Sequence, residues 1–280
     1  MKKKTFKIVF ARTSVGEDGR PIARYLRSAF NSHGSNLPAV QLDIERFQFR
    51  DLKNVGAVWT GTFVKLRDDA PHIVAADDIE HELDLEVGDR VIEKCHFIYR
   101  TRQNLLIWQV NRLAGGLSRA EQYFGQLFGQ VVALRQLMDE AALEEKLNGH
   151  LYEIDFAYDP PAQLPAGNPA WNQDAFDIMN RIDAAHAKFV FRAPRNGYLA
   201  PSAKGMVRQL VNTFGAGKIR IKLTEDMELV DLFMAPLKDS MDVELHGRYP
   251  LVEDVLEELE SAYDRQRDNI AAIPEPTQDD

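Results

Sequence analysis

The chain has 280 residues, of which 45% are hydrophobic and 28% are charged, and its formal net charge is −9. These proportions are typical of a globular protein with one large or two ordinary domains. No apolar run approaches the roughly eighteen residues of a membrane helix, and no signal-peptide-like stretch follows the basic start, which predicts a cytoplasmic protein. The single cysteine, Cys95, excludes an intramolecular disulfide and a multi-cysteine metal site.

Apolar residues alternate with polar ones through much of the first half, which is typical of half-buried strands. A helix that begins at Pro21 and ends before Gly34 interrupts this pattern. The acidic stretch 68–89 has few apolar residues, so we expect a solvated loop with a short helix. The predicted strands cover residues 4–13, paired runs within 40–66, and a hairpin made of 91–100 and 104–113.

A second helix is predicted after the Gly115-Gly116 break. Ser118 lies three residues before Glu121, which is the spacing of a capping box. Aromatic and aliphatic residues then recur on one face of this helix. A strand near 131–137, a helix near 140–147 and a strand near 151–158 follow.

Four prolines within residues 159–169 indicate a linker or long loop. We therefore expect an α+β fold with two lobes of mainly antiparallel sheet and packed helices. The predicted domains are residues 1–158 and 170–273, and a disordered tail is expected at 274–280. The predicted elements of the second domain are helices at 171–184, 201–214 and 251–270 and strands at 188–192, 218–223, 229–234 and 241–246.

Charge is segregated in this second domain. Residues 188–223 contain eight basic side chains and no acidic one, so the remainder of the chain carries −17. A cationic surface on an anionic body attracts phosphate groups. The eight residues, which are our predicted nucleic-acid-binding set, are Lys188, Arg192, Arg195, Lys204, Arg208, Lys218, Arg220 and Lys222.

The spacing of these cations predicts that each element turns them away from its apolar side. Lys218, Arg220 and Lys222 alternate with apolar residues and share one face of a strand. Lys188 and Arg192 share a face of an earlier strand, and Lys204 and Arg208 lie one helical turn apart. Contacts through such residues fix position on a phosphate backbone without reading sequence.

Two alternatives remain open from the residues. The basic face could meet an acidic partner, or the chain's own acidic C-terminal helix, whose acids include Glu253, Asp254, Glu257, Glu258 and Glu260. The chain could also be a metal-dependent nuclease, because Glu153 and Asp155 share a strand face. No complete phosphate-loop, dinucleotide-binding or nucleophile-elbow motif is present, so we expect no catalytic residues, no cofactor and no small-molecule substrate.

Several runs resemble the RexA family of phage-exclusion proteins. They are the hairpin Phe97-Ile98-Tyr99 with Leu106-Ile107-Trp108, the Arg112-Leu113-Ala114-Gly115-Gly116 break with the aromatic helix after it, and the C-terminal helix at residues 255–265. The resemblance implies a non-enzymatic, sequence-independent DNA-binding homodimer. It also implies action with a small membrane-channel partner in abortive infection, an antiviral defence. We therefore expect a cytoplasmic protein that contacts DNA phosphates through the basic segment.

Overall fold

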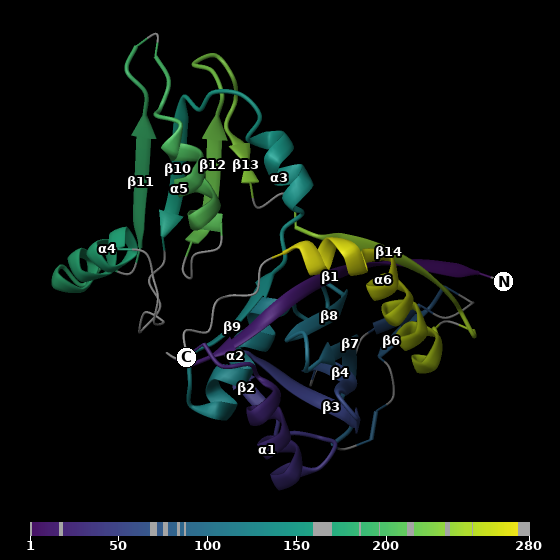
Figure 1. Ribbon diagram of the computed structural model, residues 1–280. Helices are drawn as coiled ribbons and strands as arrows, with labels where there is room; N and C mark the ends of the chain where they lie inside the picture. Colours follow the sequence, from purple (N-terminus) through teal and green to yellow (C-terminus); the bar gives the residue numbers. More distant parts are fainter. Residues whose placement is uncertain are drawn as a thin grey trace. The chain divides into compact units, whose positions relative to one another are not determined.

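The computed structural model describes residues 2–273, apart from 17–18, 68–71, 75–77, 83–84, 87, 159–169, 185, 196, 212–215, 233–235 and 248. Helices and antiparallel strands build two compact units, which confirms the predicted α+β class (Figure 1). Unit 1 consists of Met1–Val15, Pro21–Gln136 and Lys238–Arg267, whereas unit 2 consists mainly of Leu137–Leu237. No described helix combines the length and the apolar character that crossing a membrane requires.

This division differs from the predicted domains. The boundary lies between residues 136 and 137 rather than near 159–169, and residues 238–267 return to unit 1. The physical reason is long-range pairing: the strand at Lys238–Glu244 adds to the N-terminal strand, with Lys3 opposite Glu244. Alternation along one strand carries no information on its partner. The predicted linker at 159–169 and the predicted tail at 274–280 lie outside the described residues.

Unit 1 is built on one antiparallel eight-stranded sheet. The strand order is β14-β1-β8-β7-β4-β3-β2, and β9 also pairs with β1. A separate two-stranded ribbon, β5 with β6, occupies part of the acidic stretch, where a short helix was expected. The strands are β1 (Lys3–Val15), β2 (Val40–Leu42), β3 (Glu45–Val55), β4 (Val58–Arg67), β5 (His72–Val74), β6 (Glu80–Glu82), β7 (Val91–Arg100), β8 (Leu105–Val110), β9 (Val132–Gln136) and β14 (Lys238–Glu244).

An aromatic core fills one face of this sheet, beneath α1 (Ala23–His33) and α2 (Leu117–Phe128). Phe49 lies at its centre, and its ring contacts those of Phe63, Phe97 and Phe124, with centroids 4.4–5.3 Å apart. Such ring pairs add to the stabilisation that burial of their apolar area provides.

The opposite face of the sheet is buried as well. Ile8 and Phe10 of β1 alternate with the residues that enter the aromatic core, and both are fully buried. The long helix α6 (Val252–Ala272) runs beside β1 and β14 (Figure 1). Arg100, at the end of β7, forms an ion pair with Glu260 and lies over the ring of Tyr263. A sheet that is apolar on both faces therefore requires helices from both ends of the chain.

The predicted capping box of α2 is wrong. The helix begins after Gly116, and no side chain caps it. Glu121 instead lies within the helix, and its carboxylate accepts a hydrogen bond from the backbone N–H of Leu134 (2.6 Å). This contact ties α2 to β9. Burial raises the pKa of Glu121, an effect that the Leu134 hydrogen bond and nearby Arg135 oppose.

Unit 2 has a four-stranded antiparallel sheet in the order β11-β10-β12-β13. The two strands that flank β10 are consecutive in the sequence and are joined through α5, so β10 is inserted between them. The elements are α3 (Glu140–Lys146), β10 (Glu153–Tyr158), α4 (Ala170–Arg181), β11 (Ala187–Arg192), α5 (Ser202–Val211), β12 (Ala216–Lys222) and β13 (Val230–Asp231).

Candidate nucleic-acid interface

The two faces of the unit 2 sheet differ sharply in chemistry. Register places Glu153 between Arg192 on β11 and Lys222 on β12. Residues directly opposite each other in neighbouring strands lie on the same face of the sheet. The face that includes Glu153, which we call the polar face, is formed by Glu153, Asp155, Ala157, Lys188, Val190, Arg192, Arg220 and Lys222, and the backbone register also includes the positions of Lys218 and Asp231.

The other face of this sheet carries the core of unit 2. Ile154, Phe156, Ile219 and Ile221 alternate with the polar-face residues, and each is at most 1% exposed. They pack with buried side chains of the unit 2 helices, including Leu143 of α3, Met179 of α4 and Val207 of α5. The helices therefore cover the apolar face, which confirms the predicted separation of apolar and cationic residues on β11 and β12.

Two carboxylates lie at the centre of the polar face. Glu153 and Asp155 on β10 are each only 4% exposed. Arg192 Nε donates to Glu153 Oε2 at 2.8 Å. Lys188 Nζ lies 3.3 Å from Asp155 Oδ2, and the Arg220 guanidinium donates a hydrogen bond to the same oxygen. Buried ionised carboxylates need such partners, because an unpaired charge away from water is strongly unfavourable.

The cations around this pair remain accessible. The side chains of Arg192 and Lys188 are 59% and 52% exposed, whereas that of Arg220 is 27% exposed. The hydrogen bond that Arg192 donates to Glu153 raises the pKa of Arg192 further, so its charge is permanent. With four described cations and two described carboxylates, the polar face carries a net charge of +2. The side chains of Lys218 and Asp231 lie outside the described part of the structure.

The predicted basic residues do not form one surface. Lys204 and Arg208 lie on α5, in the helical layer on the other side of the sheet from the polar face. Arg208 binds Glu144 of α3 through two hydrogen bonds of 2.6 and 2.7 Å, which lower the pKa of that carboxyl group. Arg195 lies in the connection after β11. The remaining five residues are brought together on β11 and β12.

One alternative was that the acidic C-terminal helix neutralises the basic segment. The described ion pairs do not connect these two parts of the chain. Within unit 1, Glu260 pairs with Arg100, and His246 lies 3.4 Å from Asp254. The described acids that pair with the basic segment lie instead on β10 and α3. This arrangement could not be deduced from charge runs, because a cation's partner on an adjacent strand is set by register.

The carboxylates proposed for a nuclease are ion-paired with cations of the neighbouring strands. Glu153 and Asp155 do share one face, as the alternation predicted. Each is already bound by Arg or Lys, and the described residues hold no group of three or more His, Cys, Asp or Glu that could ligate a metal ion. Their geometry suits orientation of cations. The signal in the sequence was two acids in an otherwise apolar strand, next to strands that carry only bases.

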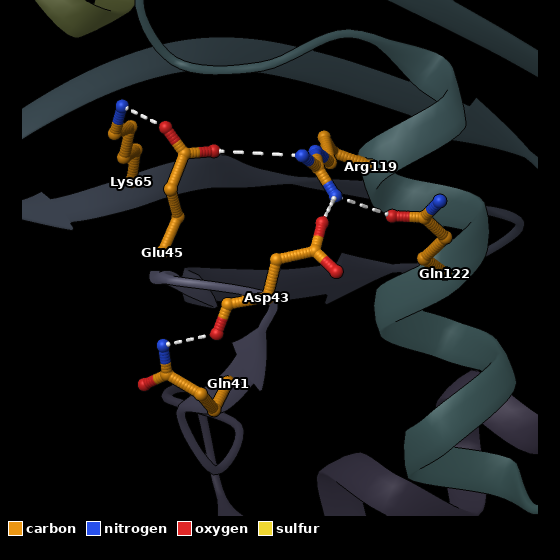
Figure 2. Close-up of polar contacts among 6 residues, drawn as sticks. All are labelled: Gln41, Asp43, Glu45, Lys65, Arg119 and Gln122. Atoms are coloured by element: carbon orange, nitrogen blue, oxygen red, sulfur yellow. Dashed lines mark hydrogen bonds and ion pairs between the residues drawn. The ribbon is translucent and has the colours of Figure 1, made fainter.

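A second charged cluster lies in unit 1 and is balanced in charge (Figure 2). Arg119 of α2 donates to Asp43 and to Gln122, both at 2.8 Å, and lies 3.8 Å from Glu45. Lys65 of β4 pairs with the same Glu45. The cluster ties the β2–β3 hairpin to α2 and β4. Because its charges cancel, it offers no net attraction for an anion.

Comparison with known proteins provides a family but no activity. No curated protein matches the sequence. Residues 35–270 match the model of a family of unknown function, DUF6731. This match covers well over half of the chain and includes the strands of the polar face. The chain therefore belongs to the DUF6731 family.

Proposed function

We propose that the protein binds nucleic acid through the polar face of unit 2, by contact with phosphates and without sequence readout. The observation that carries this proposal is a sheet face of net charge +2 in a chain of net charge −9. A local cationic field of this kind attracts polyanions even when the whole molecule is acidic.

The exposure of the polar face supports this role. Val190 lies directly opposite Asp155 and is 47% exposed, so the described helices do not cover this side of the sheet. The polar face carries no aromatic residue on which a base could stack. Affinity would therefore come from phosphates, and no discrimination between sequences is expected.

The buried carboxylates support the proposal in a second way. Asp155 holds Lys188 and Arg220 from opposite sides, and Glu153 holds Arg192. Long cationic side chains lose rotamer entropy when they bind a ligand. Cations that are already held by a buried acid lose less of that entropy, while their exposed portions can still reach a phosphate.

Salt-dependent binding tests the proposal. A labelled 20-nucleotide duplex is titrated with the full chain at salt concentrations from 50 to 200 mM, and fluorescence anisotropy is recorded. Three to four phosphate contacts predict a slope of log K against log salt of roughly −3 to −4. Single-stranded DNA, RNA and a polyglutamate peptide of similar charge serve as competitors. Competition by the peptide at equal charge concentration would favour an acidic protein partner instead.

Lys188 and Lys222 are the residues to change, because neither is the sole described partner of a buried carboxylate. Replacing both with Ser should flatten the slope by about 2, since each contact contributes roughly 0.9. Lys53→Ser, at an exposed site on β3 of unit 1, is the matched control. Absence of binding at 50 mM salt, or equal binding by the double variant and the control, would refute the proposal.

The cellular role implied by the RexA resemblance is a separate proposal. If the chain acts in phage exclusion, expressing it should lower the plating efficiency of an infecting phage. The Lys188→Ser, Lys222→Ser variant should lose that effect, and Lys53→Ser should retain it. Equal plating with and without the intact chain, over a panel of phages, would contradict this role and leave the binding proposal standing.

A further inference from the structure

The strand β11 lies at the edge of the unit 2 sheet. Among the described residues, only β10 pairs with it. An unpaired edge presents a row of N–H and C=O groups that can accept another strand. Proteins use such edges to bind extended segments or a second copy of themselves.

The hydrogen bonding between β10 and β11 shows which backbone groups face this edge. The N–H of Ala193 donates to the carbonyl of Tyr152 at 2.8 Å, in the same register as the pairing of Glu153 with Arg192. Antiparallel strands alternate between hydrogen-bonded and non-hydrogen-bonded pairs. The backbone N–H and C=O groups of Phe189 and Phe191 therefore form hydrogen bonds with β10. The N–H and C=O groups of Lys188, Val190 and Arg192 point to the open edge.

The sequence of β11 is self-complementary. Lys188-Phe189-Val190-Phe191-Arg192 has the same order of residue classes in both directions, with Val190 at its centre. We propose that a second copy of this chain pairs antiparallel with β11 around a twofold axis at Val190. In this register Val190 opposes itself, Phe189 opposes Phe191 of the partner subunit, and Lys188 opposes Arg192 of the partner subunit.

This register uses every backbone group that faces the edge. Val190 exchanges two hydrogen bonds with its own copy, and Lys188 and Arg192 exchange two with each other at both ends. An isologous interface requires this kind of reciprocity. Each polar-face residue of β11 lies opposite a polar-face residue of the other copy. The apolar faces of the two sheets therefore align, and so do the polar faces.

Two further observations fit a second copy as the occupant. Like charges would meet where Lys188 opposes the partner's Arg192, but Asp155 and Glu153 beside them offset much of this charge in each copy. Apolar side chains of β11 itself are also exposed: Phe191 is 41% exposed and Val190 is 47% exposed. Large exposed apolar residues that gather at one edge mark an interaction surface.

Pairing would also change the proposed ligand surface. The two four-stranded sheets become one continuous eight-stranded sheet, and the two polar faces merge into a face of net charge +4. This consequence rests on the proposed function, whereas the pairing itself does not. The experiments that follow are therefore made without nucleic acid, so that failure of one proposal is distinguishable from failure of the other.

Sedimentation equilibrium of the full chain tests the pairing. A reversible dimer is expected for the wild type at micromolar concentration. Val190→Pro removes an edge-facing N–H and leaves the ladder to β10 intact, because proline is tolerated where its nitrogen faces away from the sheet. Loss of the two central hydrogen bonds raises the dimer dissociation constant by about thirtyfold or more. Val190→Thr keeps the N–H and is the matched control.

Cross-linking provides a readout that does not depend on how proline is accommodated. A twofold axis at Val190 places its two Cα atoms about 5.5 Å apart, within the range of a disulfide. Val190→Cys should form a covalent dimer under mild oxidation, whereas Val55→Cys, at an exposed site in unit 1, should not. Native Cys95 does not interfere, because it is fully buried. A monomeric wild type, or cross-linking of the two variants at equal rates, overturns the proposal.

Discussion

Asp155 and Arg220 lie directly opposite each other on β10 and β12, and the guanidinium donates a hydrogen bond to a carboxylate that is 4% exposed. Arg220→Met should lower the free energy of unfolding of unit 2 by about 2 kcal/mol. This is less than the 3–5 kcal/mol typical of a fully broken buried pair, because Lys188 stays close to Asp155.

Amide hydrogen exchange in β10 and β12 measures this loss for unit 2 separately from unit 1. The double variant Asp155→Asn, Arg220→Met removes both charges and should recover most of the stability. Equal stability of Arg220→Met and the wild type would show that Asp155 is well solvated without its partner.

Gly61 of β4 is required by close packing. A Cβ atom at this position would lie 2.8 Å from Leu52 Cδ2, 3.1 Å from the carbonyl oxygen of Arg50 and 3.1 Å from Phe97 Cε1. Gly61→Ala should therefore destabilise unit 1 by about 1–3 kcal/mol, as overpacked cores do. Urea unfolding followed by fluorescence detects the change, since Trp59 and Trp108 are buried in unit 1. An unchanged midpoint would mean that the backbone of β3 moves away at little cost.

Gly205 presents the opposite case. It lies within α5, and a Cβ atom there would meet nothing within 4 Å. Glycine in a helix interior costs roughly 0.5–1 kcal/mol relative to alanine, because the unfolded chain has more conformations to lose. Gly205→Ala should stabilise unit 2 by about that amount. Slower amide exchange in α5 and β12 would confirm it, and faster exchange would contradict it.

His96 predicts a pH dependence of stability. Its Nδ1 lies 2.7 Å from Gln109 Oε1, which also accepts the backbone N–H of His96. Burial lowers the pKa of His96 below 6.5, and Lys94 acts in the same direction, whereas the Gln109 hydrogen bond and Asp51 oppose the shift. The unfolded chain then binds a proton more readily than the folded chain.

The stabilisation associated with neutral His96 is therefore present above pH 6.5 and is lost as the pH falls below that value. The urea midpoint of unit 1 should decrease from pH 7.5 to pH 5.5 more steeply in the wild type than in His96→Gln. Carboxylates that titrate at lower pH affect both proteins alike. Parallel pH profiles would show that His96 is protonated equally in the folded and unfolded chains.

Local patterns predicted most elements of this fold, because strand alternation and helical spacing are properties of neighbouring residues. The alternation of Lys188 with Phe189 and of Arg220 with Ile221 correctly assigned each side chain to a face. The pairing of Asp155 with Arg220 could not be predicted, since it depends on which strands become neighbours and in which register. For the same reason the strand at Lys238–Glu244 was assigned to the second domain, although its ladder partner is β1.

The return of residues 238–267 to unit 1 has a consequence for synthesis. As the chain emerges from the ribosome, unit 2 has its complete sheet once residue 237 is available. Unit 1 is interrupted in the sequence, so β1 cannot pair with β14 until residues 238–244 have been synthesised. The strand β1 therefore completes its pairing only after all of unit 2 up to residue 237 has been synthesised. Until then, the edge of β1 that β14 will occupy remains open to other strands.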